Sequence, residues 1–174
     1  MTKIPGKLTT WDAVSEFIFG GCATFTLVSL KTGVRFTYKV RAKKSDLERS
    51  KNVDLTGMTF DSVASSEVVY FVNLLRGPNN EQDFAYMGVL RKPARFFWTA
   101  ASGKVGRGAP AYKALLWFLD TMACRREVLG SSLEVWHEGR CVCCARKLTV
   151  PESIASGYGP ECRRRLDAPQ HLGA

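Results

Sequence analysis

The sequence contains only two histidines, His137 and His171, so few of its side chains titrate near neutral pH. It also lacks the metal-hydrolase, kinase and dinucleotide-binding patterns. Nucleophilic catalysis by Cys22, Cys124 or Cys143 would need a nearby base, and neither histidine is well placed in the sequence for that role. We therefore expect a protein that is not an enzyme and has no small-molecule substrate. Catalysis by carboxylate pairs that meet only in the folded chain stays open.

The sequence also lacks an uninterrupted apolar run of the roughly 18 residues that a transmembrane helix needs. The charge-free stretch 17–30 is shorter, and Asp12 and Glu16 lie directly before it, where a signal peptide would carry apolar residues. We expect a cytoplasmic protein with no membrane partner. Thiols stay reduced in the cytoplasm, so clustered cysteines there indicate metal binding before disulfides.

Apolar residues make up 45% of the chain, enough to form a sizeable core. Their spacing predicts an α+β fold, with an antiparallel sheet of about five strands and one packed helix, in a domain over residues 1–129. The expected elements are a short helix over 10–19, strands over 22–30, 34–42, 67–77, 83–92 and 94–100, and a packed helix over 111–127.

The stretch 34–42 shows the cleanest alternation in the chain. Val34, Phe36, Tyr38 and Val40 fall on one face of a strand, and the residues between them fall on the other. Those intervening residues include Arg35, Lys39 and Arg41. The pattern predicts a half-buried strand whose outer face is cationic.

A histidine and three cysteines lie close together in the C-terminal region. Two thiolates three positions apart can hold one ion from a tight turn, and a second pair completes the tetrahedron. Three thiolates and an imidazole fill that tetrahedron, which favours one structural zinc ion over a catalytic metal. The predicted ligands, spaced H-x3-C-x2-C-x17-C, are His137, Cys141, Cys144 and Cys162.

Two details of this ligand set stay open. Cys143 is expected to be a free thiol, because its C-x-C spacing with Cys141 suits a tight turn less well. His171 is the rival for the fourth position, and Cys143 or His171 can replace a proposed ligand. Pro160 is expected at the first position of a helix, so that Cys162 lies in its first turn, where the helix dipole favours a thiolate. Buried cysteines without metal are the alternative.

The stretch HEGRCVCCARKLTVPESIASGYGPEC resembles an uncharacterised zinc-finger family, a domain of unknown function common in bacteriophage and mobile-element proteins. The resemblance covers about the last 40 residues, and Cys143 is a departure from the pattern. It implies a metal-bound structural module of phage or plasmid origin, which we expect over 130–174 as a small treble-clef-like zinc finger. It implies no activity. The matching positions are Cys141, Cys144, Leu148, Thr149, Pro151, Ser153, Gly157, Gly159, Pro160 and Cys162.

The positive charge is concentrated in two windows. The net charge is +9; residues 31–51 hold eight basic and two acidic residues, and residues 91–107 hold five basic and none acidic. A cationic strand face continued by a glycine-rich basic loop (102–108) can neutralise successive phosphates. The residues expected to contact nucleic acid are Arg35, Lys39, Arg41, Lys43, Lys44, Arg91, Lys92, Arg95, Lys104 and Arg107.

These patterns predict a small phage-type protein that binds DNA or RNA and is held together in part by zinc. Phe97, Tyr86 and Tyr70 are candidates for stacking on bases, with packing in the core as their alternative role. A competing hypothesis is a viral protein that inhibits a host nucleic-acid enzyme, as an anti-defence or host-takeover factor. A weaker one is a structural, virion-associated protein.

Overall fold

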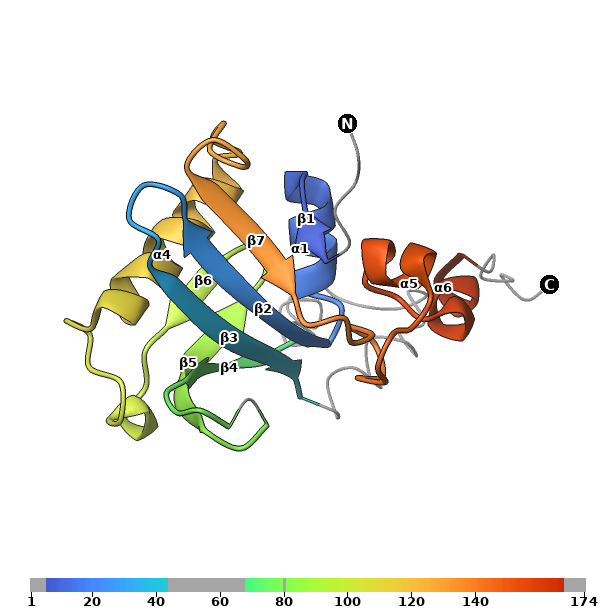
Figure 1. Cartoon of the computed structure of the whole chain (residues 1–174). Coiled ribbons are helices and arrows are strands. Elements are labelled where there is room, and N and C mark those ends of the chain that lie inside the picture. Colours follow the sequence, from blue (N-terminus) through green and yellow to red (C-terminus); the bar gives the residue numbers. More distant parts are fainter. Residues whose placement is uncertain (1–5, 44–67, 80, 168–174) are drawn as a thin grey trace, which may run out of the picture.

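The computed structural model describes residues 6–43, 68–79 and 81–167. Within these ranges, seven strands form one antiparallel sheet in the order β1-β7-β2-β3-β4-β5-β6 (Figure 1). The predicted α+β class with an antiparallel sheet is confirmed. The strands are β1 (Lys7–Leu8), β2 (Cys22–Ser29), β3 (Arg35–Ala42), β4 (Tyr70–Leu75), β5 (Phe84–Arg91), β6 (Arg95–Phe97) and β7 (Leu133–His137).

Two helices pack on the same face of this sheet, whereas the sequence predicted one packed helix. The first begins after Thr10, whose hydroxyl accepts a hydrogen bond from the Ala13 N–H (3.3 Å) and so caps the first turn. The second is fixed to β3 by the Tyr38 hydroxyl, which donates to the carbonyl of Ala111 (2.7 Å). The helices are α1 (Trp11–Ile18), α4 (Pro110–Ala123), α5 (Pro151–Ser156) and α6 (Pro160–Asp167), with a 3-10 turn, η1 (Ala100–Ser102).

The core lies between the sheet and these two helices. Tyr38 and Val40 of β3 are fully buried, whereas the alternate residues Lys39 and Arg41 point away from the helices. The predicted alternation of β3 is therefore confirmed. We call the helix-covered side the inner face of the sheet and the opposite side the outer face.

The sheet is larger than the sequence pattern suggested, because β1 and β7 extend it beyond β2. Strand β7 pairs with β2 along its whole length, from Ser29–Leu133 to Phe25–His137. It follows directly on the expected boundary at residue 130, yet belongs to the main sheet. The division of the chain into domains stays a prediction.

The segment after β7, residues 138–167, is called the cysteine module here; Figure 1 shows its helices α5 and α6 beyond the end of β7. Its Val142 and Tyr158 are buried in the same apolar cluster as the sheet. The contact is close, because a Cβ on Gly157 would lie 2.6 Å from the ring of Phe17 in α1. The Tyr158 hydroxyl also donates to the carbonyl of Glu16 (3.3 Å). The module is thus packed through α1 against the sheet and its two helices, the described residues among 6–137, which are called the sheet domain here.

Candidate metal centre and nucleic-acid interface

The first two cysteines of the candidate metal centre lie in a tight hairpin. Its stem is an antiparallel bridge between Arg140 and Lys147, closed by a hydrogen bond from Cys141 N–H to Arg146 C=O (2.8 Å). Ala145 adopts a left-handed conformation (φ 61°), which is unusual for a residue with a side chain. This turn brings the thiols at 141 and 144 to the same side.

Three thiols converge at this hairpin. The sulfur atoms of Cys141, Cys144 and Cys162 all lie within 4.8 Å of one another. Cys162 comes from the first turn of α6, which begins at Pro160 as predicted. In a tetrahedral zinc site with Zn–S bonds of ~2.3 Å, sulfur atoms are about 3.8 Å apart, so the cluster fits one such ion after a small contraction.

The surroundings of the three thiols are unequal. Burial raises the pKa of Cys141, but the N–H groups of Gly159, Cys144 and Cys143 point at its sulfur and lower the pKa below its ordinary value. Burial, followed by hydrogen bonds with the thiols of Cys144 and Cys141, raises the pKa of Cys162 to about 12. A bound cation would favour deprotonation of all three thiols, because thiolates are the species that bind metal.

His137 is not part of this cluster. Its Nδ1 accepts a hydrogen bond from the Gly139 N–H (3.1 Å), and its Nε2 is 2.6 Å from the carbonyl oxygen of Ile154, to which it donates. Its ring also packs on Phe17, 5.0 Å between centroids. Burial lowers its pKa, against the opposing effect of the Ile154 hydrogen bond. Both nitrogens are engaged, so this geometry does not support the expected role of His137 as the fourth ligand.

The other candidates for the fourth position differ in what the structure says of them. Cys143 lies between two residues of the cluster on the hairpin and is exposed. His171 lies outside the described residues. The group of mutually close sulfur atoms does not include Cys143, so the thiol of Cys143, His171 and a water molecule all stay candidates for the fourth position.

The outer face of the sheet carries many of the expected basic residues. On β3 these are Arg35, Lys39 and Arg41, whose partners across to β4 include Asn73 and Phe71. At the other end of the sheet, Arg91 of β5 pairs with Arg95 of β6, and residues paired across antiparallel strands share a face. The expected basic residues on this face thus come from three strands, β3, β5 and β6.

Aromatic side chains lie among these cations. Phe71 of β4 and Phe97 of β6 are 38% and 42% exposed, and Phe71 packs on Tyr86 of β5 with 6.3 Å between ring centroids. Phe97 and Tyr86 were expected as stacking candidates, and both lie on the outer face. Tyr70 does not, because it is buried and its hydroxyl donates to the carbonyl of Phe19.

Several cations on the outer face are positioned directly over aromatic rings. The Lys39 ammonium lies 3.6 Å from the ring centroid of Phe84, and the Arg95 guanidinium carbon lies 5.7 Å from that of Phe97. A ring held in this way keeps one face for the cation and leaves its other face or edge for further contacts. Phe84 and Phe71 were not predicted, because the outer face of β4 and β5 cannot be assigned without the strand register.

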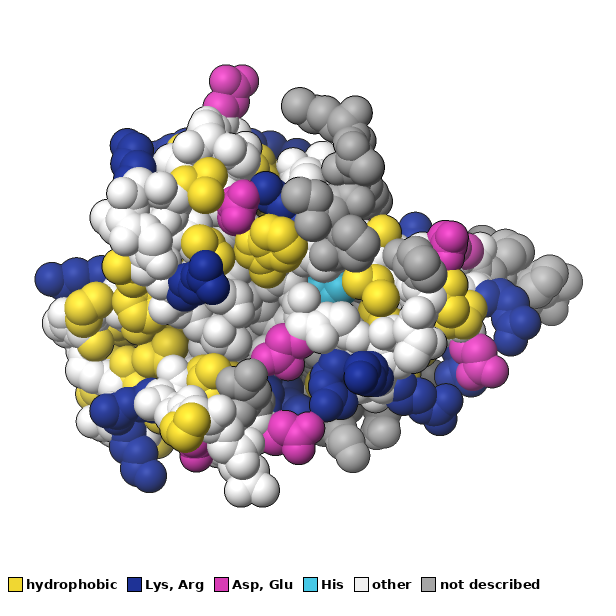
Figure 2. All heavy atoms as spheres, in the orientation of Figure 1, with side chains coloured by type: hydrophobic (Ala, Val, Ile, Leu, Met, Phe, Trp, Pro, Cys, Tyr) yellow, Lys and Arg dark blue, Asp and Glu magenta, His cyan; other side chains and the backbone are white. Residues whose placement is uncertain are grey.

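A polar groove of about 590 Å³ lies where this face meets the cysteine module. Burial, and then the charge of Arg41, lower the pKa of Lys39, while burial raises the pKa of Glu138. Figure 2 shows basic and acidic side chains side by side here, at the end of β3. The charged residues that line the groove are Lys39, Arg41, Arg140, Lys147, Glu81 and Glu138.

The remaining basic residues are not gathered on the outer face. Lys92 lies over the ring of Phe19, beside α1. The loop 102–108 is anchored, since Val105 is buried and its carbonyl accepts a hydrogen bond from the Trp98 indole (3.2 Å). This loop holds Arg107 over the ring of Trp98 (4.7 Å), and its Lys104 lines the same pocket as Phe84. Lys43 follows β3, and Lys44 lies outside the described residues.

One part of the chain matches a known protein family. Residues 133–167 match the model of a family of unknown function, DUF6011. The matched range includes all three clustered cysteines. Searches of the curated proteins and of the solved structures found no match. The expected family resemblance near the C-terminus is thus confirmed, while its zinc-finger nature and phage origin stay predictions. No helix in the described part of the chain is long and apolar enough to cross a membrane.

Proposed function

We propose that this protein binds single-stranded nucleic acid on the outer face of its sheet. The observation that carries the proposal is the interleaving of exposed rings, Phe71 and Phe97, with the cations Lys39, Arg41 and Arg95 on neighbouring strands. Proteins that bind single strands combine a cationic surface for the backbone with rings on which unpaired bases stack. In a duplex the faces of the bases are covered, so exposed rings on a sheet favour a single strand.

The groove at the end of β3 extends this surface toward the cysteine module. Arg140 and Lys147 belong to the cysteine hairpin, and Lys39 and Arg41 belong to the sheet. A phosphate in the groove would contact cations from both regions. Glu81 already pairs with Arg140 (3.0 Å), so a bound phosphate would compete with that carboxylate.

We further propose that the three thiols hold one structural zinc ion. Three soft sulfur ligands on a tight turn and a helix start suit zinc, and a small module with little apolar core gains stability from such a cross-link. The metal would hold the hairpin that carries Arg140 and Lys147 in position beside the sheet. This division of roles describes a binding protein rather than an enzyme.

The experiment is a titration of the protein against fluorescently labelled single-stranded DNA, duplex DNA and RNA at several salt concentrations. We expect single strands to bind more tightly than duplex, and affinity to fall steeply as salt rises. The variant Lys39→Gln/Arg41→Gln should weaken binding and reduce the slope of log K against log salt by about 1.4, the value for two lost phosphate contacts on a single strand.

The matched control is Lys113→Gln/Arg164→Gln, which removes the same charge from exposed positions on α4 and α6. It should leave the slope nearly unchanged. Equal effects of the two double variants would mean that net charge alone drives binding and would reject the outer face as the site.

A further inference from the structure

A second pocket lies on the inner side of the sheet, away from the outer face, where α4 and the β2–β3 hairpin diverge. Its volume is about 380 Å³. Val34 belongs to the inner face by alternation, yet it is 47% exposed, whereas Tyr38 farther along β3 is fully buried under α4. The helix leaves this end of the inner face uncovered. Within the described part of the chain, an apolar cavity therefore lies beside the core, on the part of the inner face that α4 does not cover.

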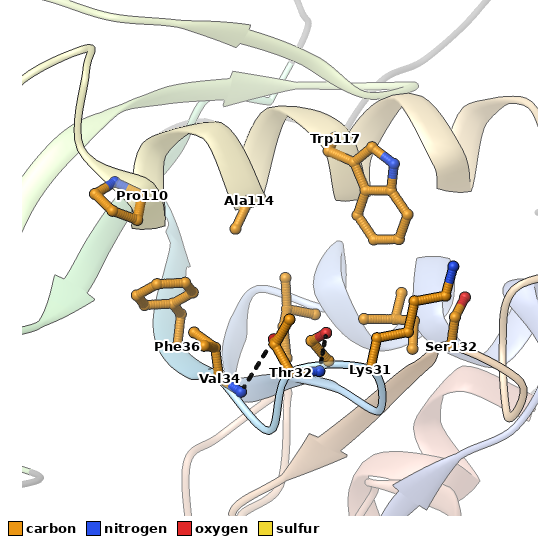
Figure 3. Close-up of a pocket in the computed structure, with 11 residues that line it drawn as sticks. Lys31, Thr32, Val34, Phe36, Pro110, Ala114, Trp117 and Ser132 are labelled. Atoms are coloured by element: carbon orange, nitrogen blue, oxygen red, sulfur yellow. Dashed lines mark hydrogen bonds between the residues drawn. The ribbon is translucent and has the colours of Figure 1, made fainter.

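The pocket has an apolar end and a polar end. Figure 3 shows Phe36 and Pro110 facing each other at one end, and Lys31 with Ser132 at the other, across from Trp117. The wall between them is made by one face of α4 and by the hairpin. An occupant with an apolar body along α4 and a polar group at the Lys31 end matches this arrangement.

The polar end offers donors. The hydroxyl oxygens of Ser29 and Thr32 already accept hydrogen bonds from the N–H groups of Thr32 and Val34. The main-chain carbonyls of Ser29 and Ser132 are likewise engaged, by the N–H groups of Gly33 and Leu30. Hydroxyl protons and the Lys31 ammonium remain, and no acidic side chain is among the described residues that line the pocket. Such a set suits an anionic acceptor.

We propose that this pocket binds an amphipathic carboxylate, with its apolar body between α4 and the hairpin and its carboxylate at Lys31. This site is separate from the proposed nucleic-acid surface and does not depend on it. Apolar walls with a few convergent polar groups, at a volume in the range of ligand sites, are typical of small-molecule pockets.

The test is calorimetric titration of the full chain with hexanoate, octanoate and decanoate, below the concentrations at which they form micelles. Each added methylene should strengthen binding about fourfold, the effect expected for burying one methylene. Decan-1-ol, which has the same chain but no charge, should bind at least about tenfold more weakly than decanoate. Absence of binding by all three carboxylates, or equal binding of the alcohol, would overturn the proposal.

Three variants locate the site. Lys31→Gln should weaken decanoate binding about tenfold and leave decanol binding unchanged. Lys113→Gln is the matched control, because Lys113 is an exposed lysine of α4 outside the pocket, and it should bind as the natural protein does. Ala114→Phe places a ring in the pocket from the half-exposed side of α4 and should abolish binding of both ligands. Undiminished binding by Ala114→Phe, with its thermal unfolding unchanged, would reject this location.

Discussion

The sheet domain and the cysteine module are stabilised in different ways. In the sheet domain, large side chains such as Phe25, Tyr38 and Phe118 pack between strands and helices. In the module, α6 has no buried residue, and the buried Val142 and Tyr158 pack into the core of the sheet domain rather than into one of their own. A segment this small depends on its neighbour and on a cross-link between its thiols.

The largest effect should follow from removing a thiol of the cluster. Cys162→Ser or Cys144→Ser should lower the zinc content from one ion per chain to nearly none and unfold the module, because two sulfur ligands hold the metal far less well than three. Zinc content and thermal unfolding are the measurements. The control is Cys124→Ser, an exposed cysteine at the end of α4, which should keep its zinc. Full zinc content in the cluster variants would show that the thiols are not ligands.

The next effect concerns the contact between the two regions. Gly157→Ala should destabilise the protein by ~1–3 kcal/mol more than Gly139→Ala. Both glycines have positive φ (77° and 69°), so the backbone cost of alanine is similar. A Cβ at position 157 would meet Phe17 at 2.6 Å, whereas one at 139 would meet nothing within 4 Å. Denaturant unfolding of the two variants therefore isolates the clash with Phe17. Equal losses in the free energy of unfolding would mean that the module is not in close contact with α1.

A smaller effect is expected at His137, whose ring nitrogens are hydrogen-bonded to Ile154 and Gly139 in this structure. His137→Ala should retain one zinc ion per folded chain but lower the free energy of unfolding by about 1–3 kcal/mol, because the carbonyl of Ile154 and the N–H of Gly139 lose their partners in a partly buried place. Metal content and chemical unfolding measured on the same sample decide the matter. A folded variant that has lost its zinc would return His137 to the ligand set.

The smallest effect is expected at Glu138 in the groove. Partial burial raises the pKa of this carboxyl above the ordinary value for glutamate, so it gains its proton at a higher pH and the groove becomes more positive as pH falls. Affinity for a single strand should accordingly rise as pH decreases. Glu138→Gln should bind about twofold more tightly at neutral pH and lose that part of the pH dependence. Parallel pH profiles for the variant and the natural protein would exclude Glu138 as the source.

Much of the fold could be predicted from local patterns, and the reasons differ by element. Strict alternation over 34–41 distinguishes the two faces of β3, and the Thr10 cap and Pro110 start mark the two packed helices. Strand β1 is only two residues long, which is too short for a periodic signal. The helix α5 is also short, and its place depends on the packing around Gly157.

The candidate site was less accessible to sequence reasoning. The run 68–75 is apolar at nearly every position, so only the pairing of Phe71 with Arg41 shows which of its rings lies outside. A register shift between Val72 and Asn73 further obscures the alternation across to β5. His137 has a suitable spacing for a ligand, and its hydrogen bond to Ile154, 17 residues away, becomes visible only in the folded chain.

The binding of unpaired bases on the outer face is tested by the affinity of Phe71→Ala/Phe97→Ala for a labelled single-stranded oligonucleotide, measured at several salt concentrations. We predict a loss of affinity of about tenfold or more with an unchanged salt slope, because stacking involves no phosphate. Leu116→Ala/Val150→Ala, which removes two comparably exposed apolar side chains elsewhere (39% and 47%), should bind normally. If Phe71→Ala/Phe97→Ala bound the oligonucleotide as tightly as the natural protein does, the outer face would not be the surface that binds unpaired bases.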